Sequence, residues 1–281
     1  MTGSPRCFVI GLGNMGAAIG ERLASTGADV VGVDMSADAR GVFEAATACP
    51  TFERWDPATA SPGDRVMILV RTPAQARAVL QELDESGLEL IAYVMTTLDV
   101  VAARELADAG RGAVRVVEAP LSGGRSGAID GSLTMMIAGP VTDDDRAFLL
   151  GHIAGHVVDF EHYGQPNAAK LHNNVLAAYH ARAHAEVLLV GERNGIDIER
   201  LDQVLNHSSG ASWMGEHLAV VVDDLLDKDV ALFAESFGAP PAITIGADSD
   251  LAAALATARE RLTGPDTDRA RTRPDGSTHA G

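Results

Sequence analysis

The sequence predicts an α/β protein, with a doubly wound parallel sheet first and an all-α C-terminal domain led by a long interdomain helix. Up to about residue 163, short apolar runs alternate with amphipathic stretches, a pattern typical of βαβ units. From residue 164 onward the periodicity is helical. We therefore expect domains at residues 1–163 and 164–264, followed by a disordered tail at 265–281, which is polar and rich in Pro and Gly.

The first domain is expected to open with alternating strands and helices. Residues 6–10 and 29–33 are predicted strands, and residues 14–25 and 36–47 are predicted helices, with Ser36 as a helix cap. The run RVMILV is apolar throughout, which is typical of a strand buried on both faces. This and the other expected strands lie at 65–70, 88–94, 113–118, 133–138 and 156–160.

The second domain is expected to begin with one long helix over 167–193, which lacks Gly and Pro until Gly191. That length exceeds an ordinary crossover helix. Asp197 and Ser249 are predicted caps of later helices. Those helices are expected at 198–207, at 215–237 with a break, and at 249–262.

Composition excludes several classes of protein. The 281 residues are 46% hydrophobic, which suits a sizeable core, and no apolar run is long enough to span a membrane. The net charge of -17 argues against nucleic-acid binding. Two cysteines, Cys7 and Cys49, are too few for a disulfide framework. The N-terminus has no secretory signal pattern, so we expect a cytoplasmic protein.

Lysine is used at only two positions. Of 22 basic residues, all but Lys170 and Lys228 are arginine. Codon bias could leave two lysines by chance. Alternatively, an ammonium group, whose pKa can shift, is required at these places. Composition alone leaves both explanations open.

The first expected strand runs directly into a glycine-rich turn that opens a helix. In that context Gly11-x-Gly13-x-x-Gly16 predicts a Rossmann-type dinucleotide site. The first glycine permits the turn, the second lets a pyrophosphate approach, and the third lets the helix pack on the sheet. The predicted cofactor-binding residues of this loop are Gly11, Leu12, Gly13, Asn14, Met15 and Gly16.

Asp34 ends the second expected strand, where a carboxylate can accept hydrogen bonds from a ribose hydroxyl. It would also repel a 2′-phosphate, and the next residue is Met35 rather than an arginine. These residues favour NAD over NADP as the cofactor. The alternative is that Asp34 only caps the following helix.

Several further segments match one family in order. They are TTL at 96–98, EAPLSGG at 118–124, GQPNAAKLHNN at 164–174, EVL at 186–188, GID at 195–197 and KD at 228–229. Together with GLGNMG at 11–16, they show that the chain resembles the β-hydroxyacid dehydrogenases over roughly residues 6 to 237.

The resemblance implies hydride transfer between a nicotinamide and a small 3-hydroxy acid, or its semialdehyde or keto partner. Lys170 would be the general acid/base, which requires a lowered pKa. Asn174, one helical turn further on, would orient the substrate or the lysine. The carboxylate would be held by Ser122, Gly123 and Gly124, whose turn exposes N–H groups. On the cofactor side the resemblance places Thr97 and Lys228.

Two of the departures from the family concern the site. Glu118 replaces the family's Asp, and the segment between Trp213 and Lys228 is shorter than in the family. The edge of the substrate pocket should therefore differ. Arg125, beside the carboxylate turn, is either a cation that steers an acidic substrate or a solvated loop residue.

Two rival functions stay open. An imine reductase shares the architecture, but its members generally replace the lysine and favour NADP. A non-catalytic NAD(H)-binding regulatory module would not need Lys170, Asn174 and the Ser-Gly-Gly turn together. His180 and His184 are spaced as a possible metal pair, but they have no third ligand nearby, so no metal site is expected. We expect a homodimer, because so small a helical domain rarely closes its own core.

Overall fold

A computed structural model describes residues 5–109, 112–220, 223–243 and 255. Residues 1–240 form one compact unit and residues 241–281 a second. The elements below belong to the first unit. The predicted tail at 265–281 and most of the predicted helix at 249–262, with its cap Ser249, lie outside the described residues.

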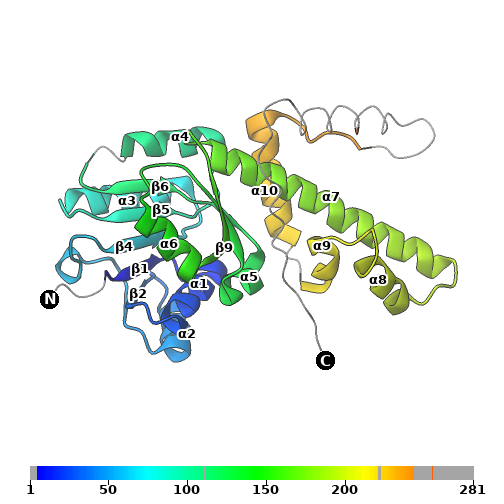
Figure 1. Cartoon of the computed structure of the whole chain (residues 1–281), viewed down its shortest axis with the longest axis horizontal. Helices are drawn as coiled ribbons and strands as arrows, with labels where there is room; N and C mark the ends of the chain where they lie inside the picture. Colours follow the sequence, from blue (N-terminus) through cyan, green and yellow to red (C-terminus); the bar gives the residue numbers. More distant parts are fainter. Residues whose placement is uncertain (1–4, 110–111, 221–222, 244–254, 256–281) are drawn as a thin grey trace. The chain divides into compact units, whose positions relative to one another are not determined.

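The main sheet has six strands, all parallel, in the order β3-β2-β1-β4-β5-β6 (Figure 1). This confirms the predicted parallel sheet. The strands are β1 (Cys7–Ile10), β2 (Val30–Val33), β3 (Thr51–Phe52), β4 (Arg65–Ile68), β5 (Ile91–Val94) and β6 (Arg115–Glu118). Between them run the helices α1 (Asn14–Ser25), α2 (Ala37–Thr47), α3 (Pro73–Glu85) and α4 (Val100–Ala109), and the short 3-10 helix η1 (Pro57–Thr59).

Both faces of this sheet are covered. Along β1, Cys7 and Val9 belong to one buried cluster, and Phe8 and Ile10 belong to the other. Successive side chains of a strand point to opposite faces, so two cores form, one on each side of the sheet. This explains why the strand sequences are apolar throughout rather than alternating.

The next strands form a separate sheet, whereas the sequence pattern had suggested continued alternation. This three-stranded sheet contains β7 (Leu121–Ser122), β8 (Leu133–Ile137) and β9 (Ala154–Asp159), and β7 pairs antiparallel with β8. Its helices are α5 (Gly124–Asp130) and α6 (Asp143–His152). The chain turns after β7 because Gly123 and Gly124 adopt positive φ angles of 127° and 64°.

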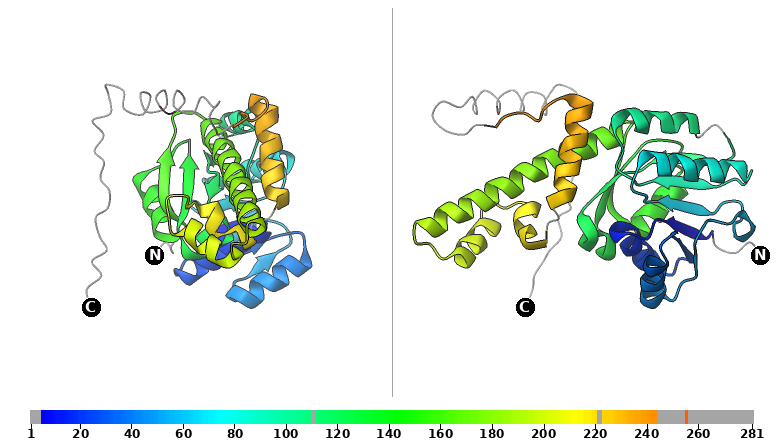
Figure 2. Two further views of the ribbon diagram at one scale, coloured as in Figure 1. Left: turned by 90° about the vertical axis from the view of Figure 1, so that its right-hand side faces the viewer. Right: turned by 180° about the vertical axis from the view of Figure 1, so that it is seen from behind.

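The helical part begins with α7 (Gln165–Arg193), which confirms the predicted long helix (Figure 2). It continues with α8 (Ile198–Asn206), capped by Asp197 as predicted, then α9 (Trp213–Glu216), η2 (Leu218–Val220) and α10 (Asp223–Phe237). The predicted break within 215–237 is therefore real. A small core formed by Leu171, Val175 and Phe233 joins α7 to α10. Within the described residues, the helices are too short or too polar to cross a membrane.

Candidate active site

The glycine loop between β1 and α1 has the shape that a dinucleotide requires. A side chain at Gly11 would stand 2.4 Å from the Leu69 carbonyl oxygen, and one at Gly16 would stand 1.8 Å from the Gly11 carbonyl oxygen. Both positions therefore demand glycine. A side chain at Gly13 would meet nothing within 4 Å, so the backbone there faces open space. A pyrophosphate can approach at that point, in front of the first N–H groups of α1.

Asp34 closes the loop from the end of β2. One carboxylate oxygen accepts from the Leu12 N–H at 2.8 Å and the other from the Ser36 N–H at 2.8 Å. Arg40 Nη1 donates to the carbonyl oxygens of Asp34 at 2.7 Å and Met35 at 3.2 Å. A guanidinium therefore lies beside the backbone of Asp34 and Met35, and the sequence argument, which considered only Met35, did not predict it.

Lys170 and Asn174 lie one turn apart on α7, as predicted. Lys170 Nζ donates to Asn174 Oδ1 at 2.9 Å, and Asn174 Nδ2 donates to the carboxylate of Asp229 on α10. Burial lowers the pKa of Lys170 from 10.5 to about 8, and the negative charge of Asp229 opposes this shift. The amine can therefore gain or lose a proton near neutral pH.

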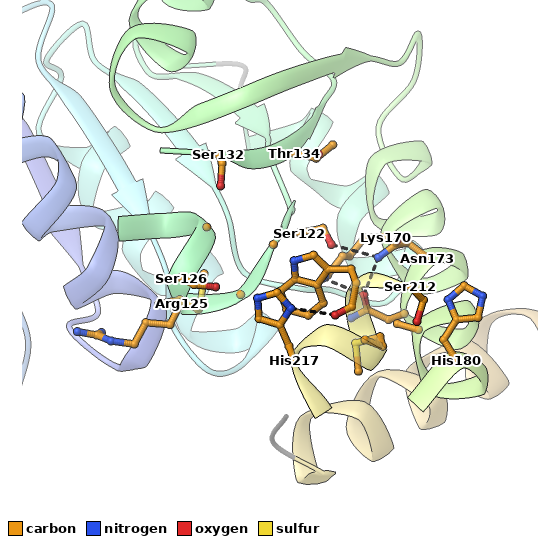
Figure 3. A pocket seen from close by; sticks show the side chains of 18 of the residues that line it. Ser122, Arg125, Ser126, Ser132, Thr134, Lys170, Asn173, His180, Ser212 and His217 are labelled. Atoms are coloured by element: carbon orange, nitrogen blue, oxygen red, sulfur yellow. Dashed lines mark hydrogen bonds between the residues drawn. The ribbon is translucent and has the colours of Figure 1, made fainter. Parts of the chain in front are cut away.

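The Ser122-Gly123-Gly124 turn faces this lysine across a cleft of about 1170 Å³. Asn173 connects the two sides, because its Nδ2 donates to Ser122 Oγ and to Asn174 Oδ1, each at 3.1 Å. Figure 3 shows Ser122, Lys170 and Asn173 close together. Other residues that line the cleft are Asn14, Met15, His180, Ser212, Trp213 and His217.

Comparison with known proteins agrees with this geometry. A family model described as the NAD binding domain of 6-phosphogluconate dehydrogenase matches residues 6–158. A second, described as NAD-binding of NADP-dependent 3-hydroxyisobutyrate dehydrogenase, matches residues 164–260. An L-threonate dehydrogenase of Cupriavidus necator is 33% identical over 219 residues, which cover 74% of this chain and 72% of the relative. The chain belongs to the β-hydroxyacid dehydrogenase family.

Two more relatives agree. Human mitochondrial 3-hydroxyisobutyrate dehydrogenase is 32% identical over 74% of this chain, and the match spans 63% of the human protein's length. A crystal structure of 3-hydroxyisobutyrate dehydrogenase from Salmonella typhimurium superposes with a TM-score of 0.71 at 25% identity, covering 85% of this chain and 90% of that one. Members of this family are NAD(P)-dependent oxidoreductases that act on CH–OH groups, which is the class of this chain.

The predicted residues do not all share one cleft in this dehydrogenase. The lining includes Lys170, Asn174, the Ser-Gly-Gly turn, Asn14 and Met15, whereas Thr97 and Lys228 are not part of it. Thr97 is partly exposed on the loop after β5, and Lys228 is exposed on α10. The neighbour of Lys228, Asp229, is 8% exposed and is the residue of that pair that reaches Asn174.

Sequence reasoning did not assign Asn173 and Trp213, which line the cleft, or Asp229, which accepts a hydrogen bond from Asn174 behind it. Helical periodicity could have placed Asp229 on the same face of α10 as Phe233, one turn further on, but it could not have indicated the contact with Asn174. Trp213 stacks on His217, with ring centroids 4.0 Å apart, and its ring edge lies 3.3 Å from where a Gly124 side chain would begin. Nothing in the sequence indicated that contact.

Two other side chains have clear positions. Arg125 donates to the Asn14 carbonyl oxygen at 2.9 Å and to Glu21 at 3.1 Å, so it ties α5 to α1 and points away from the lysine (Figure 3). His184 Nε2 lies 2.7 Å from Asp202, whereas His180 lines the cleft. The two histidines on α7 therefore have different surroundings.

Proposed function

We propose that this chain transfers a hydride between NAD and a small 3-hydroxy acid, or its semialdehyde or keto partner, with Lys170 as general acid/base. The observation that carries this proposal is the position of Lys170. Its amine, with a pKa lowered by burial to about 8, shares one cleft with a turn suited to a carboxylate and with Asn14 and Met15 of the loop suited to a dinucleotide.

Each residue has a physical role in the proposed reaction. Ser122 Oγ and the N–H groups of Gly123 and Gly124 hold the substrate carboxylate. Asn174 holds Lys170 and the substrate hydroxyl in place. A bound nicotinamide would supply the hydride acceptor in oxidation and the hydride donor in reduction. In oxidation Lys170 takes the hydroxyl proton, and in reduction its ammonium returns that proton to the carbonyl oxygen.

The two directions should differ in their pH dependence. Oxidation needs the free amine, so its rate should rise as pH passes about 8, the pKa of Lys170. Reduction needs the ammonium, so its rate should fall over the same interval.

The preference for NAD rests on Asp34. Its carboxylate holds the Leu12 and Ser36 N–H groups and keeps lone pairs for a ribose hydroxyl, while its charge opposes a 2′-phosphate. Arg40 favours the phosphate, but its Nη1 is engaged by two carbonyl oxygens. NADP is the second candidate cofactor, and one of the matching family models is described as NADP-dependent.

The substrate class follows from the cleft and from relatives named for L-threonate and 3-hydroxyisobutyrate. Nicotinamide absorbance, followed over a panel of 3-hydroxy acids with NAD and with NADP, tests the proposal. Lys170→Ala is the key variant, and Arg182→Ala, at an exposed position of the same helix, is its control. We expect turnover with NAD that is lost in Lys170→Ala and kept in Arg182→Ala. Full activity in Lys170→Ala would refute the role of the lysine.

An imine reductase or a non-catalytic NAD(H)-binding module fits the cleft less well. Neither explains a lysine with a lowered pKa facing a Ser-Gly-Gly turn. Tight NADH binding without turnover of any acid in the panel would favour the module, whereas turnover of cyclic imines with NADPH would favour the reductase.

We also infer a nucleotide-binding domain at 1–163, a helical domain at 164–264 and a homodimer that packs through the helical domain. Helix α8 buries none of its own residues. Large apolar side chains are exposed on α7 and α8, namely Leu176, Val187, Leu189, Val190, Ile198 and Val204. A second copy would cover them. Sedimentation of the wild type and of Val190→Lys tests this: a monomeric wild type would refute it.

A further inference from the structure

Glu118 is a fully buried carboxylate that takes no direct part in the proposed reaction. It ends β6, is 0% exposed, and does not line the cleft. Burial raises its pKa, while three N–H donors oppose that shift by stabilising the ionised form. The donors are Gly164 N at 2.5 Å, Asn167 N at 2.8 Å and Asn167 Nδ2 at 2.7 Å.

These donors belong to the first turn of α7. The residue that caps this helix, Gly164, has no side chain and a φ angle of 89°. A helix start leaves N–H groups without intrahelical partners and favours a negative charge. Glu118 supplies both an acceptor and a charge from a different element, so the strand β6 caps the helix that carries Lys170.

Asn167 extends this contact to a third segment. Its side chain is fully buried, and its Oδ1 accepts from the Leu98 N–H at 2.8 Å. Glu118 accepts only, so it forces the NH₂ of Asn167 toward itself and the oxygen toward Leu98. One amide therefore joins the loop after β5, the end of β6 and the start of α7.

Each of these three segments leads directly to the cleft or to a predicted cofactor contact. Lys170 follows Asn167 by one helical turn, Ser122 follows Glu118 by four residues, and Thr97 precedes Leu98. We propose that Glu118 and Asn167 are positioning residues, which together fix Lys170 relative to the Ser122 turn and the Leu98 loop. This inference rests on the proposed role of Lys170.

The experiment has to separate positioning from stability. The key variants are Glu118→Asp, Asn167→Gln and the double variant, in which one side chain loses the methylene that the other gains. Asp145→Asn is the matched control, because Asp145 is also a buried carboxylate that caps a helix, but it lies at α6. If Glu118→Asp does not fold, Asn167→Ala is used in its place, because Asn167→Ala removes only the hydrogen bonds of the Asn167 side chain.

Two readouts are measured well below the melting temperature. One is kcat, with cofactor affinity as an internal check. The other is the titration of Lys170 by NMR on protein with isotope-labelled lysine. The chain has two lysines, and the exposed Lys228 provides the reference signal.

We expect each single variant to lose about tenfold or more in kcat, because a misplacement of ~1 Å can cost about 10²-fold. The Lys170 titration should shift by at least about half a pH unit, while cofactor affinity stays within about threefold. The double variant should recover part of the lost kcat and reverse part of the shift in the Lys170 titration. Asp145→Asn should lower the melting temperature but leave the Lys170 titration unchanged.

A purely structural role predicts a different pattern. The single variants would then melt earlier, but kcat and the Lys170 titration would match the wild type, which would overturn the inference. Failure of the double variant to recover would also overturn it. If Lys170→Ala keeps full activity, the proposed function fails instead, and the NMR titration still tests whether this pair positions Lys170.

Discussion

Asn174 stands between Lys170 and Asp229, accepting from the first through Oδ1 at 2.9 Å and donating to the second through Nδ2. The carboxylate accepts only, so it fixes which end of the amide faces the lysine. Asp229 also acts through its charge, since it raises the pKa of Lys170 against the larger effect of burial. These two effects lead to the first prediction.

Replacing Asp229 with Asn should move the pH profile to lower pH. Without the negative charge, the pKa of Lys170 falls below about 8, so the free amine forms earlier and the oxidation rate begins to rise at lower pH. The measurement is kcat for oxidation against pH. Asp227→Asn, an equal change of charge at an exposed position of α10, should leave the profile in place. An unshifted profile in Asp229→Asn would contradict the charge argument.

Replacing Lys170 with Met should abolish turnover and stabilise the fold. Because burial lowers the pKa of Lys170, folding with a charged lysine is unfavourable below about pH 8. That cost disappears as pH rises toward the unfolded value of 10.5. We expect up to ~3 kcal/mol of stabilisation at pH 6 and little at pH 10.5. Denaturant unfolding at both pH values measures it, and Lys228→Met is the exposed control. Equal stability of Lys170→Met and the wild type at pH 6 would contradict it.

Replacing Asp34 with Ser should shift the cofactor preference toward NADP. The change removes the charge that opposes a 2′-phosphate and leaves Arg40 beside the site. We expect the ratio of kcat/KM for NADP to that for NAD to rise about tenfold or more, equivalent to ~1.4 kcal/mol. Asp38→Ser, in the first turn of α2, is the control for net charge. An unchanged ratio would show that Asp34 does not determine the preference between NAD and NADP.

Replacing Gly124 with Ala should weaken substrate binding. The residue has a φ angle of 64°, and the new side chain would lie 3.3 Å from the ring edge of Trp213. We expect KM for the acid to rise about tenfold, since the turn can no longer present its N–H groups as before. Gly63→Ala also places a side chain at a positive φ, of 90°, but in open space away from the cleft, and it should leave KM unchanged. Parallel effects in the two variants would mean that strain alone is responsible.

The main sheet was predictable because its strands are buried on both faces and read as apolar runs. The strands β3 and β7 were not predicted, since each has only two residues and no pattern of its own. The separate sheet of β8 and β9 depends on the turn at Gly123 and Gly124, and turn geometry is not visible as hydrophobic periodicity.

The residues of the site also divide into those that the sequence could predict and those that it could not. The motif that contains Lys170, Asn173 and Asn174 is local, so its residues could be placed on one helix face from their spacing. Asp229 approaches from a helix 55 residues further along the chain from Asn174, and local spacing carries no information about such a contact. The family resemblance pointed to Lys228, whereas the residue that bonds Asn174 is its neighbour, Asp229.

Because Asp229 belongs to α10, the acid/base role proposed for Lys170 depends on the last described helix, whereas the glycine loop and Asp34 do not. Proteolysis before α10 would leave a fragment that still contains the nucleotide-binding segment. Such a fragment would compete with intact enzyme for the same pool of dinucleotide while turning nothing over. A titration with dinucleotide would count each such fragment as an active site. The rate of a partly degraded preparation would then be divided by too many sites, and its turnover number would come out too low.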